Sequence, residues 1–404
     1  MKRLSVFTVA IATLLAVLPV FQQHSDARAQ DITITVRPED KPAKRPFKGK
    51  RAAVDVAILL DTSNSMDGLI NQAKSQLWKI IQEFADAEKA GKTPLLRVSV
   101  FEYGNTNLPA SEGYVRQVCQ LTDDLDKVSE SLFDLKTNGG DEYCGTVINE
   151  ALKRLDWSTQ TNAYKAIFIA GNEPFTQGSV DYKKACAKAI QSGVVVNTIH
   201  CGDYQTGVNG KWKHGAELAE GKYMNINQDR AIVHIKAPQD KIIIELNNKL
   251  NKTYLWYGAK NQREYFRSNQ ILQDSNAYGL GGGGQRGATK ASSLYRNEGR
   301  DLVDTFEADA KLLSKVKDSA LPEEMQRMTL AEREAHIKKL GEQRAAIKKQ
   351  MLEATKAREA FVEKERRKMA DQAGESSTLG GAISQSVREQ LERSGFELKK
   401  NKSN

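Results

Sequence analysis

Residues 54–70 read VDVAILLDTSNSMDGLI and decide the fold. Residues 54–60 form a nearly continuous apolar run, which is typical of a parallel strand covered on both faces. The run ends at Asp61, and Ser63 and Ser65 follow at alternate positions before an amphipathic helical pattern begins. Because alternate residues of an extended segment project to the same side, we expect these three oxygen-bearing side chains to converge.

The surrounding block, residues 53–258, alternates apolar strands with amphipathic helices. Further strands are expected at 95–103, 113–120 (an edge strand), 165–170 and 194–200, and further helices at 147–155 and 181–191. This alternation predicts an α/β fold with a doubly wound, mostly parallel sheet flanked by helices. In such sheets ligands bind in the loops at the carboxyl ends of the strands, which is where Asp61 stands.

The start of the chain has the pattern of an export signal. Residues 1–29 combine a basic start, an apolar segment over 4–21 and the small-x-small sequence Ala27-Arg28-Ala29. The alternative is an uncleaved membrane anchor, against which Pro19 and the cleavage sequence argue. Residues 30–52 are polar and read as a flexible leader. We therefore expect an exported bacterial protein of the periplasm, the extracellular space or the cell surface, without a transmembrane segment after cleavage.

The C-terminal part has a different composition. Residues 259–300 are rich in Gly, Ser and Asn and predict a linker, whereas residues 301–404 predict a helical, coiled-coil-like region. An imperfect heptad pattern over 323–371 is interrupted at Arg344 and Arg358. It is compatible with an intramolecular helical hairpin or with a coiled coil to a partner or a second copy. We expect this region to pack little against the preceding domain.

Charge and cysteine content restrict the function further. The formal charge is +9, but basic and acidic residues alternate in the C-terminal third and no nucleic-acid motif accompanies them, so we expect no nucleic-acid partner. The four cysteines, an even number, permit disulfides in an exported protein. Cys186 and Cys201 are expected to lie close together, with Cys144 as a competing partner; Cys119 completes the set.

The convergence of Asp61, Ser63 and Ser65 has two interpretations. Such residues often cap a helix. They are also hard oxygen ligands, suited to Mg²⁺, Mn²⁺ or Ca²⁺ rather than to zinc. The position after a buried strand and before an amphipathic helix favours the metal site.

In this context the motif DxSxS resembles the metal ion-dependent adhesion site of von Willebrand factor type A domains, and the resemblance covers about residues 53–258. It implies a divalent cation that is held by protein oxygens and that keeps one coordination position for an acidic residue of a protein partner. Of the three ions, Mg²⁺ is our first choice, because it is bound by few protein ligands and keeps its waters.

Two motifs of this family are altered here. The threonine expected after the glycines of the second loop is replaced by Asp141, which follows Gly139-Gly140. The aspartate expected after the third-loop strand is replaced by Gly171. One carboxylate is therefore lost and one gained, and we predict the ligands Asp61, Ser63, Ser65 and Asp141. Further candidate ligands are Glu173 and Asn172, with Thr137 and Thr146 as fallbacks.

No catalytic motif accompanies this site: HExxH, GxSxG and a phosphate-binding loop are absent from the sequence. We therefore expect a non-enzymatic protein that mediates cation-dependent adhesion or protein–protein interaction. The alternative is an accessory subunit of an envelope enzyme or ATPase complex, with the domain as a docking module.

Overall fold

Strand β1 (Ala53–Asp61) lies inside a six-stranded sheet in the computed structural model of the protein, which describes residues 51–230, 232, 234–369 and 378–398. Its parallel neighbours are β3 (Leu95–Tyr103) and β5 (Tyr164–Gly171), and Asp61 pairs in register with Tyr103. Every residue of β1 is buried. The interior position expected from the apolar run is confirmed, whereas the expected signal peptide lies outside the described residues.

The sheet has the order β4-β3-β1-β5-β6-β7. Strand β4 (Val115–Thr122) is an edge strand and the only antiparallel member of this sheet. Strands β6 (Val195–Cys201) and β7 (Tyr223–Ile226) continue the sheet in parallel on the other side. The mostly parallel α/β sheet is thus as predicted, and the carboxyl ends of five strands share one edge.

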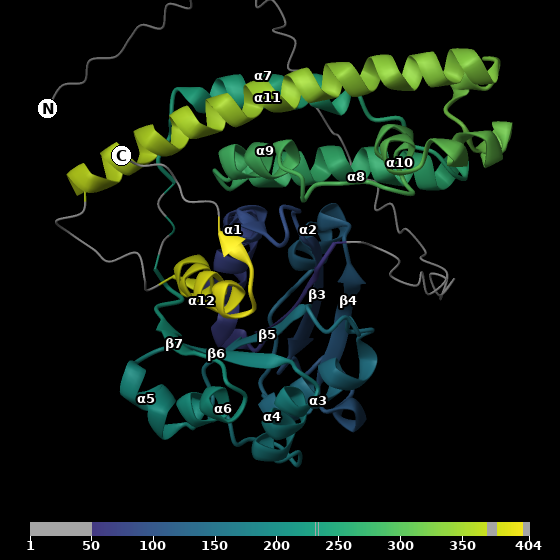
Figure 1. Ribbon diagram of the computed structural model, residues 1–404. Helices are drawn as coiled ribbons and strands as arrows, with labels where there is room; N and C mark the ends of the chain where they lie inside the picture. Colours follow the sequence, from purple (N-terminus) through teal and green to yellow (C-terminus); the bar gives the residue numbers. More distant parts are fainter. Residues whose placement is uncertain (1–50, 231, 233, 370–377, 399–404) are drawn as a thin grey trace, which may run out of the picture. The chain divides into compact units, whose positions relative to one another are not determined.

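Helices cover both faces of the sheet (Figure 1). Alternate residues of β1 face opposite layers: Ile58 belongs to the core that includes α1 (Asp67–Ala85) and α2 (Leu125–Phe133), and Leu59 belongs to the other core. That second core includes α3 (Cys144–Arg154), α4 (Tyr182–Gln191) and α6 (Trp212–Leu218), and the short α5 (Tyr204–Asn209) lies beside α6. The strand is therefore apolar along its length because both of its faces are covered.

The predicted linker at 259–300 is wrong, because this segment forms α8 (Lys260–Gly279) and α9 (Gly283–Ala291). Its polar residues are buried in ion pairs: Lys290 Nζ lies 2.9 Å from Asp274 Oδ2. Its glycines allow close packing, since a Cβ at Gly287 would collide with Ile243. The glycine and polar residues that made this segment resemble a linker therefore serve close helix packing and buried ion pairs.

The longest helix, α11 (Leu330–Met369), packs on α7 (Gln239–Asn251) and α9, while α10 (Leu302–Ala308) packs near its start (Figure 1). Arg344 and Arg358 interrupt the heptad pattern, but both are buried and bind carboxylates of the same chain. Since Ile337 and Met351 on the same seam are also buried within the chain, the seam is occupied. This corrects the coiled-coil alternative for these positions in favour of intramolecular packing.

The last helix, α12 (Leu379–Arg393), returns to the sheet and packs on α1. Val387 of α12 and Met351 of α11 belong to the same hydrophobic core as Val56 of β1. After α12, β8 (Glu397–Leu398) pairs with β2 (Ala87–Glu88). The expectation that the C-terminal region packs little against the domain is therefore wrong, because the two share one core.

The four cysteines are buried and unpaired. Cys186 on α4 lies in the core on one face of the sheet, and Cys201 at the end of β6 lies in the core on the other face. The expected proximity of these two residues is therefore wrong, because alternate residues of a strand face opposite sides. None of the helices in the described ranges combines the length and apolar character needed to cross a membrane.

Candidate metal centre

The first loop places Asp61, Ser63 and Ser65 together at the end of β1. Asp61 Oδ1 accepts a hydrogen bond from the Ser63 backbone N–H at 2.8 Å. The Ser63 and Ser65 hydroxyls lie 3.3 Å apart. Asp61 is 0% exposed and Ser63 2%, whereas Ser65 is open to solvent. The three side chains therefore lie together as predicted. The Asp61 carboxylate is at the buried end of the group and the Ser65 hydroxyl is at the exposed end.

The second loop brings Glu142, rather than the predicted Asp141, to Asp61. Gly104, which has φ +79°, lies against both carboxylates: a Cβ there would be 2.9 Å from Asp61 Oδ1 and 2.7 Å from Glu142 Cγ. Glu142 is 5% exposed. Asp141 lies instead beside Tyr143, whose pKa is raised by burial and then by the Asp141 carboxylate. The second carboxylate of the site is thus one residue later than expected.

The third loop contributes Asn172. Its side-chain amide donates to the Ser65 hydroxyl at 3.1 Å. Glu173 is exposed and accepts a hydrogen bond from Gln177 at 3.3 Å, so it lies at the rim. Gly171 lies against the Tyr103 hydroxyl, which donates to the Ala170 carbonyl at 3.0 Å. A side chain at position 171 would collide with Tyr103, which explains physically why no aspartate stands there.

The fallback residues of the second loop are engaged elsewhere. Thr137 donates its hydroxyl hydrogen to Asp67 Oδ1. Thr146 lies on α3 against Gly113, where a Cβ would be 2.8 Å from Thr146 Cγ2. No contact between the described residues brings either threonine to Asp61.

The site is electrostatically unusual. Burial, assisted by the nearby Glu173 charge, raises the pKa of Asp61 to about 7. Burial and then the Asp61 charge raise the pKa of Glu142 to about 8, with Glu173 and Asp141 acting in the same direction. The charged neighbours named among the largest causes of these two shifts are all carboxylates. Within the part of the chain that the structure describes, the site thus concentrates negative charge without an ion pair to a basic side chain.

Three buried oxygens at the site have no hydrogen-bond partner among the described residues: Asp61 Oδ2, Glu142 Oε2 and Asn172 Oδ1. Buried acceptors without a partner are costly, so their presence together indicates a missing positive group. Carboxylate, amide and hydroxyl oxygens fit a hard divalent cation. Asp61, Glu142, Asn172, Ser63 and Ser65 would hold it. The described residues contain no group of three or more His, Cys, Asp or Glu side chains with metal-binding geometry, so hydroxyl and amide oxygens must complete this set.

Sequence reasoning missed Glu142 and Tyr103. Asp141 and Glu142 are adjacent carboxylates after two glycines, and the left-handed backbone at Gly139 (φ +66°) sets the direction of the loop. Both residues carry the required chemistry, and only the path of the loop distinguishes them. Glu142 could have been considered because it is adjacent to Asp141, but no sequence pattern indicates which of the two carboxylates faces Asp61.

Residues 55–216 match the model of the family described as the von Willebrand factor type A domain. This part of the chain is a von Willebrand factor type A domain, as the DxSxS motif between a buried strand and an amphipathic helix led us to expect. The match begins within β1 and ends within α6, so helices α7–α12 lie outside it. Comparison with curated proteins gives no match.

Several solved structures are similar to parts of the chain. An aerotolerance-related membrane protein from Bacteroides fragilis is 18% identical over 44% of this chain and 94% of its own, with a TM-score of 0.31. BatB from Bacteroides thetaiotaomicron is 16% identical over 43% and 90%, with a TM-score of 0.34. Proximal thread matrix protein 1 from the mussel byssus, with a zinc-occupied adhesion site, is 13% identical over 45% and 43%, with a TM-score of 0.32.

Proposed function

We propose that the protein is an exported, non-enzymatic binding protein whose von Willebrand factor type A domain engages a protein partner through a divalent cation. Domains of this type generally act as interaction modules. The observation that carries the proposal is the presence of three unpartnered buried oxygens, from Asp61, Glu142 and Asn172, in the loops at the carboxyl edge of the sheet. That edge is the usual place for ligands in open α/β sheets.

The residues of the site would have different roles in binding the cation. Asp61 and Glu142 supply two negative charges that balance a dication, and Ser63 and Ser65 supply neutral oxygens. Because Ser65 is exposed while Asp61 is fully buried, the approach from solvent lies on the Ser65 side. A bound dication, with Mg²⁺ preferred, would offer its remaining positions to water or to an aspartate or glutamate of the partner.

The alternative role is that of an accessory subunit, with the domain docking an envelope enzyme or ATPase. The integrated helices α7–α11 favour a fixed shape over a flexible tether, which suits either role. Periplasmic or surface location is part of the proposal and rests on the sequence of residues 1–29 alone.

Titration calorimetry on the purified protein tests the metal site. We expect one equivalent of Mg²⁺, Mn²⁺ or Ca²⁺ to bind wild type and none to bind Asp61→Ala. Glu142→Gln should weaken binding at least about tenfold, because it removes one of two charged ligands. Asp141→Asn is the matched control and should stay within about twofold of wild type.

A pull-down from envelope extract, with and without chelator, then tests the partner. Retention of a protein that is lost with chelator and with Asp61→Ala supports the proposal. If calorimetry detects no heat with any of the three ions, the proposal is contradicted. If Asp141→Asn and Glu142→Gln lose metal affinity equally, Asp141 is a ligand as well as Glu142.

A further inference from the structure

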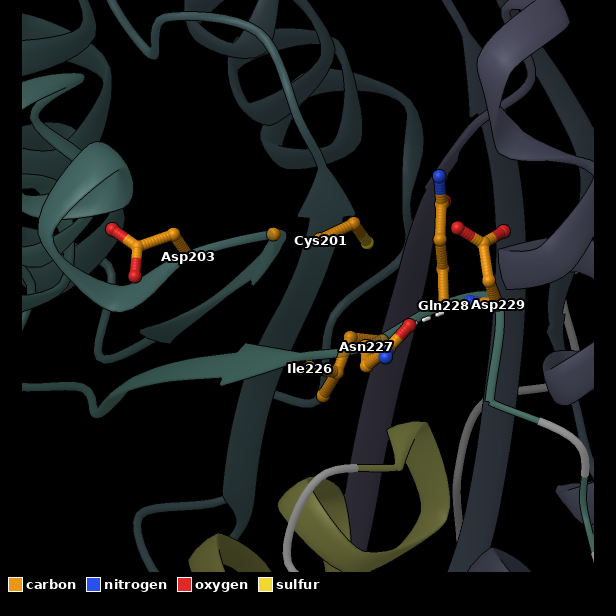
Figure 2. Close-up of a pocket in the computed structure, with 7 residues that line it drawn as sticks. Cys201, Asp203, Ile226, Asn227, Gln228 and Asp229 are labelled. Atoms are coloured by element: carbon orange, nitrogen blue, oxygen red, sulfur yellow. Dashed lines mark hydrogen bonds between the residues drawn. The ribbon is translucent and has the colours of Figure 1, made fainter.

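A second polar hollow adjoins the metal centre. It lies at the carboxyl ends of β6 and β7 and has a volume of about 380 Å³. Figure 2 shows Asp203 on one side of Cys201 and Gln228 and Asp229 on the other. Ile226 also lines the hollow, and its side chain is fully buried in the core beneath it. We call this hollow the side pocket; its volume falls within the range of about 300–1,000 Å³ that small-molecule and side-chain ligands occupy.

The side pocket is attached to the metal-binding loop. Gln228 donates its side-chain amide to the Ser65 carbonyl at 2.8 Å. Asp229 lies at the first turn of α1, where a Cβ at Gly68 would be 3.2 Å from Asp229 Oδ1. Cys201, at the end of β6, also lines the pocket. The pocket is therefore joined through Gln228 to the loop that carries Ser65.

The carboxylates of the side pocket are not equivalent. Asp203 caps α5 by accepting hydrogen bonds from the backbone N–H and the hydroxyl of Thr206, so its charge serves the helix. Asp229 is exposed, so its carboxylate is open to solvent. Gln228 Oε1 is a buried acceptor without a hydrogen-bond partner among the described residues. The pocket thus offers one exposed carboxylate and one amide oxygen.

These features match a long basic side chain. The ammonium or guanidinium head of lysine or arginine binds a carboxylate and can also donate a hydrogen bond to an amide oxygen. A dication at the metal centre would neutralise Asp61 and Glu142 but would leave Asp229 uncompensated. A second metal ion fits less well, because one carboxylate and one amide oxygen are a poor donor set for it.

We propose that the side pocket receives a lysine or arginine of the same partner whose acidic residue binds the cation. The recognised feature of the partner is then an acidic residue with a basic residue within a few positions or nearby on its surface. This inference rests on the proposed function and names the class of partner for that site.

An array of eight-residue peptides tests this pairing. Each peptide has a Gly/Ser background and one aspartate, with lysine, norleucine or glutamate placed one to four residues away on either side. In Mg²⁺, we expect wild type to retain the best lysine peptides about fivefold more than their norleucine counterparts, which have the same stem without the charge. Chelator should abolish this retention.

Variants separate the side pocket from the metal centre. Asp229→Asn should reduce the preference for lysine to about one while keeping Mg²⁺ affinity within about twofold, and Asp229→Lys should shift the preference to glutamate. Glu173→Gln, which changes another rim carboxylate outside the pocket, should leave the preference for lysine unchanged.

Three outcomes overturn the inference. Equal retention of lysine and norleucine peptides, or no retention of any peptide, refutes it even where calorimetry detects Mg²⁺ binding. A second Mg²⁺ equivalent that disappears in Asp229→Asn identifies the pocket as a cation site instead. If wild type binds no divalent ion, the proposed function fails first, and calorimetry distinguishes that result from failure of the side pocket alone.

Discussion

Two buried aspartates of this protein have opposite pKa shifts. Asp61 at the edge of the sheet is fully buried, and burial raises its pKa to about 7. Asp274 in α8 is buried to nearly the same extent, and burial acts on it in the same direction, but Lys290 and Arg286 hold its pKa below the usual range. The difference is the presence of a cation supplied by the chain.

The same contrast holds for the two regions as a whole. In the helical region, Arg344 lies 2.7 Å from both Asp301 and Asp304 and donates to the Thr253 carbonyl at 2.5 Å. These buried charges are paired, and they join α11 to the segment before it. At the metal centre no ion pair joins the buried carboxylates of Asp61 and Glu142 to a basic side chain of the described residues. Paired buried charge thus marks the assembly of the fold, whereas unpaired buried charge marks a site for an external cation.

The largest expected effect comes from breaking a pair. Arg344→Ala leaves Asp301 and Asp304 buried without a cation, which costs about 3–5 kcal/mol in the free energy of unfolding. Urea denaturation measures this loss. Lys349→Ala, on an exposed position of the same helix, is the control and should change stability by less than about 0.5 kcal/mol. An Arg344→Ala protein within about 1 kcal/mol of wild type would contradict the role of the pair.

A smaller effect is expected from pH at the unpaired site. The pKa values of Asp61 and Glu142 are raised from 3.8 and 4.5 to about 7 and about 8, so between these values the folded state binds more protons than the unfolded state. Without metal, the contribution of these groups to stability is present below about pH 4 and is lost as pH rises to about 8.

Urea denaturation in chelator at pH 5.5 and pH 8 measures this loss. At pH 8, Asp61→Asn should be more stable than wild type by about 2 kcal/mol, because it removes one of two like charges, and the two proteins should differ less at pH 5.5. Mg²⁺ should stabilise wild type more at pH 8 than at pH 5.5. A pH dependence that is identical in wild type and Asp61→Asn would show that these carboxylates are not the source.

The smallest effect concerns the cysteines, which are buried but belong neither to the buried ion pairs nor to the metal centre. Burial raises the pKa of the Cys186 thiol to about 12, and Cys186 and Cys201 lie on opposite faces of the sheet. We expect no disulfide between them after exposure of the folded protein to air. Peptide mapping under non-reducing conditions checks this, and a linked pair would mean that the sheet register at β6 differs from the one described.

Much of the fold could be predicted because its signals are local. The apolar run of β1, the edge position of β4 and the extent of β3 follow from patterns a few residues long. The linker prediction failed at α9 because Arg286 and Lys290 read as solvated charges, although their partners lie on α2 and α8. Arg344 and Arg358 were likewise interpreted as interruptions of a coiled coil, although their carboxylate partners lie far away in the sequence.

The sequence by itself determined that a buried parallel strand ends in Asp61, and that Ser63 and Ser65 converge beside it, because the apolar run and the period-two geometry both lie within one short stretch. Only the tertiary structure decided that Glu142 rather than Asp141 faces Asp61. It also decided that the C-terminal helices share the core of the domain. Both depend on which groups meet across long sequence separations, and a buried charge acquires its role from those neighbours and not from its own identity.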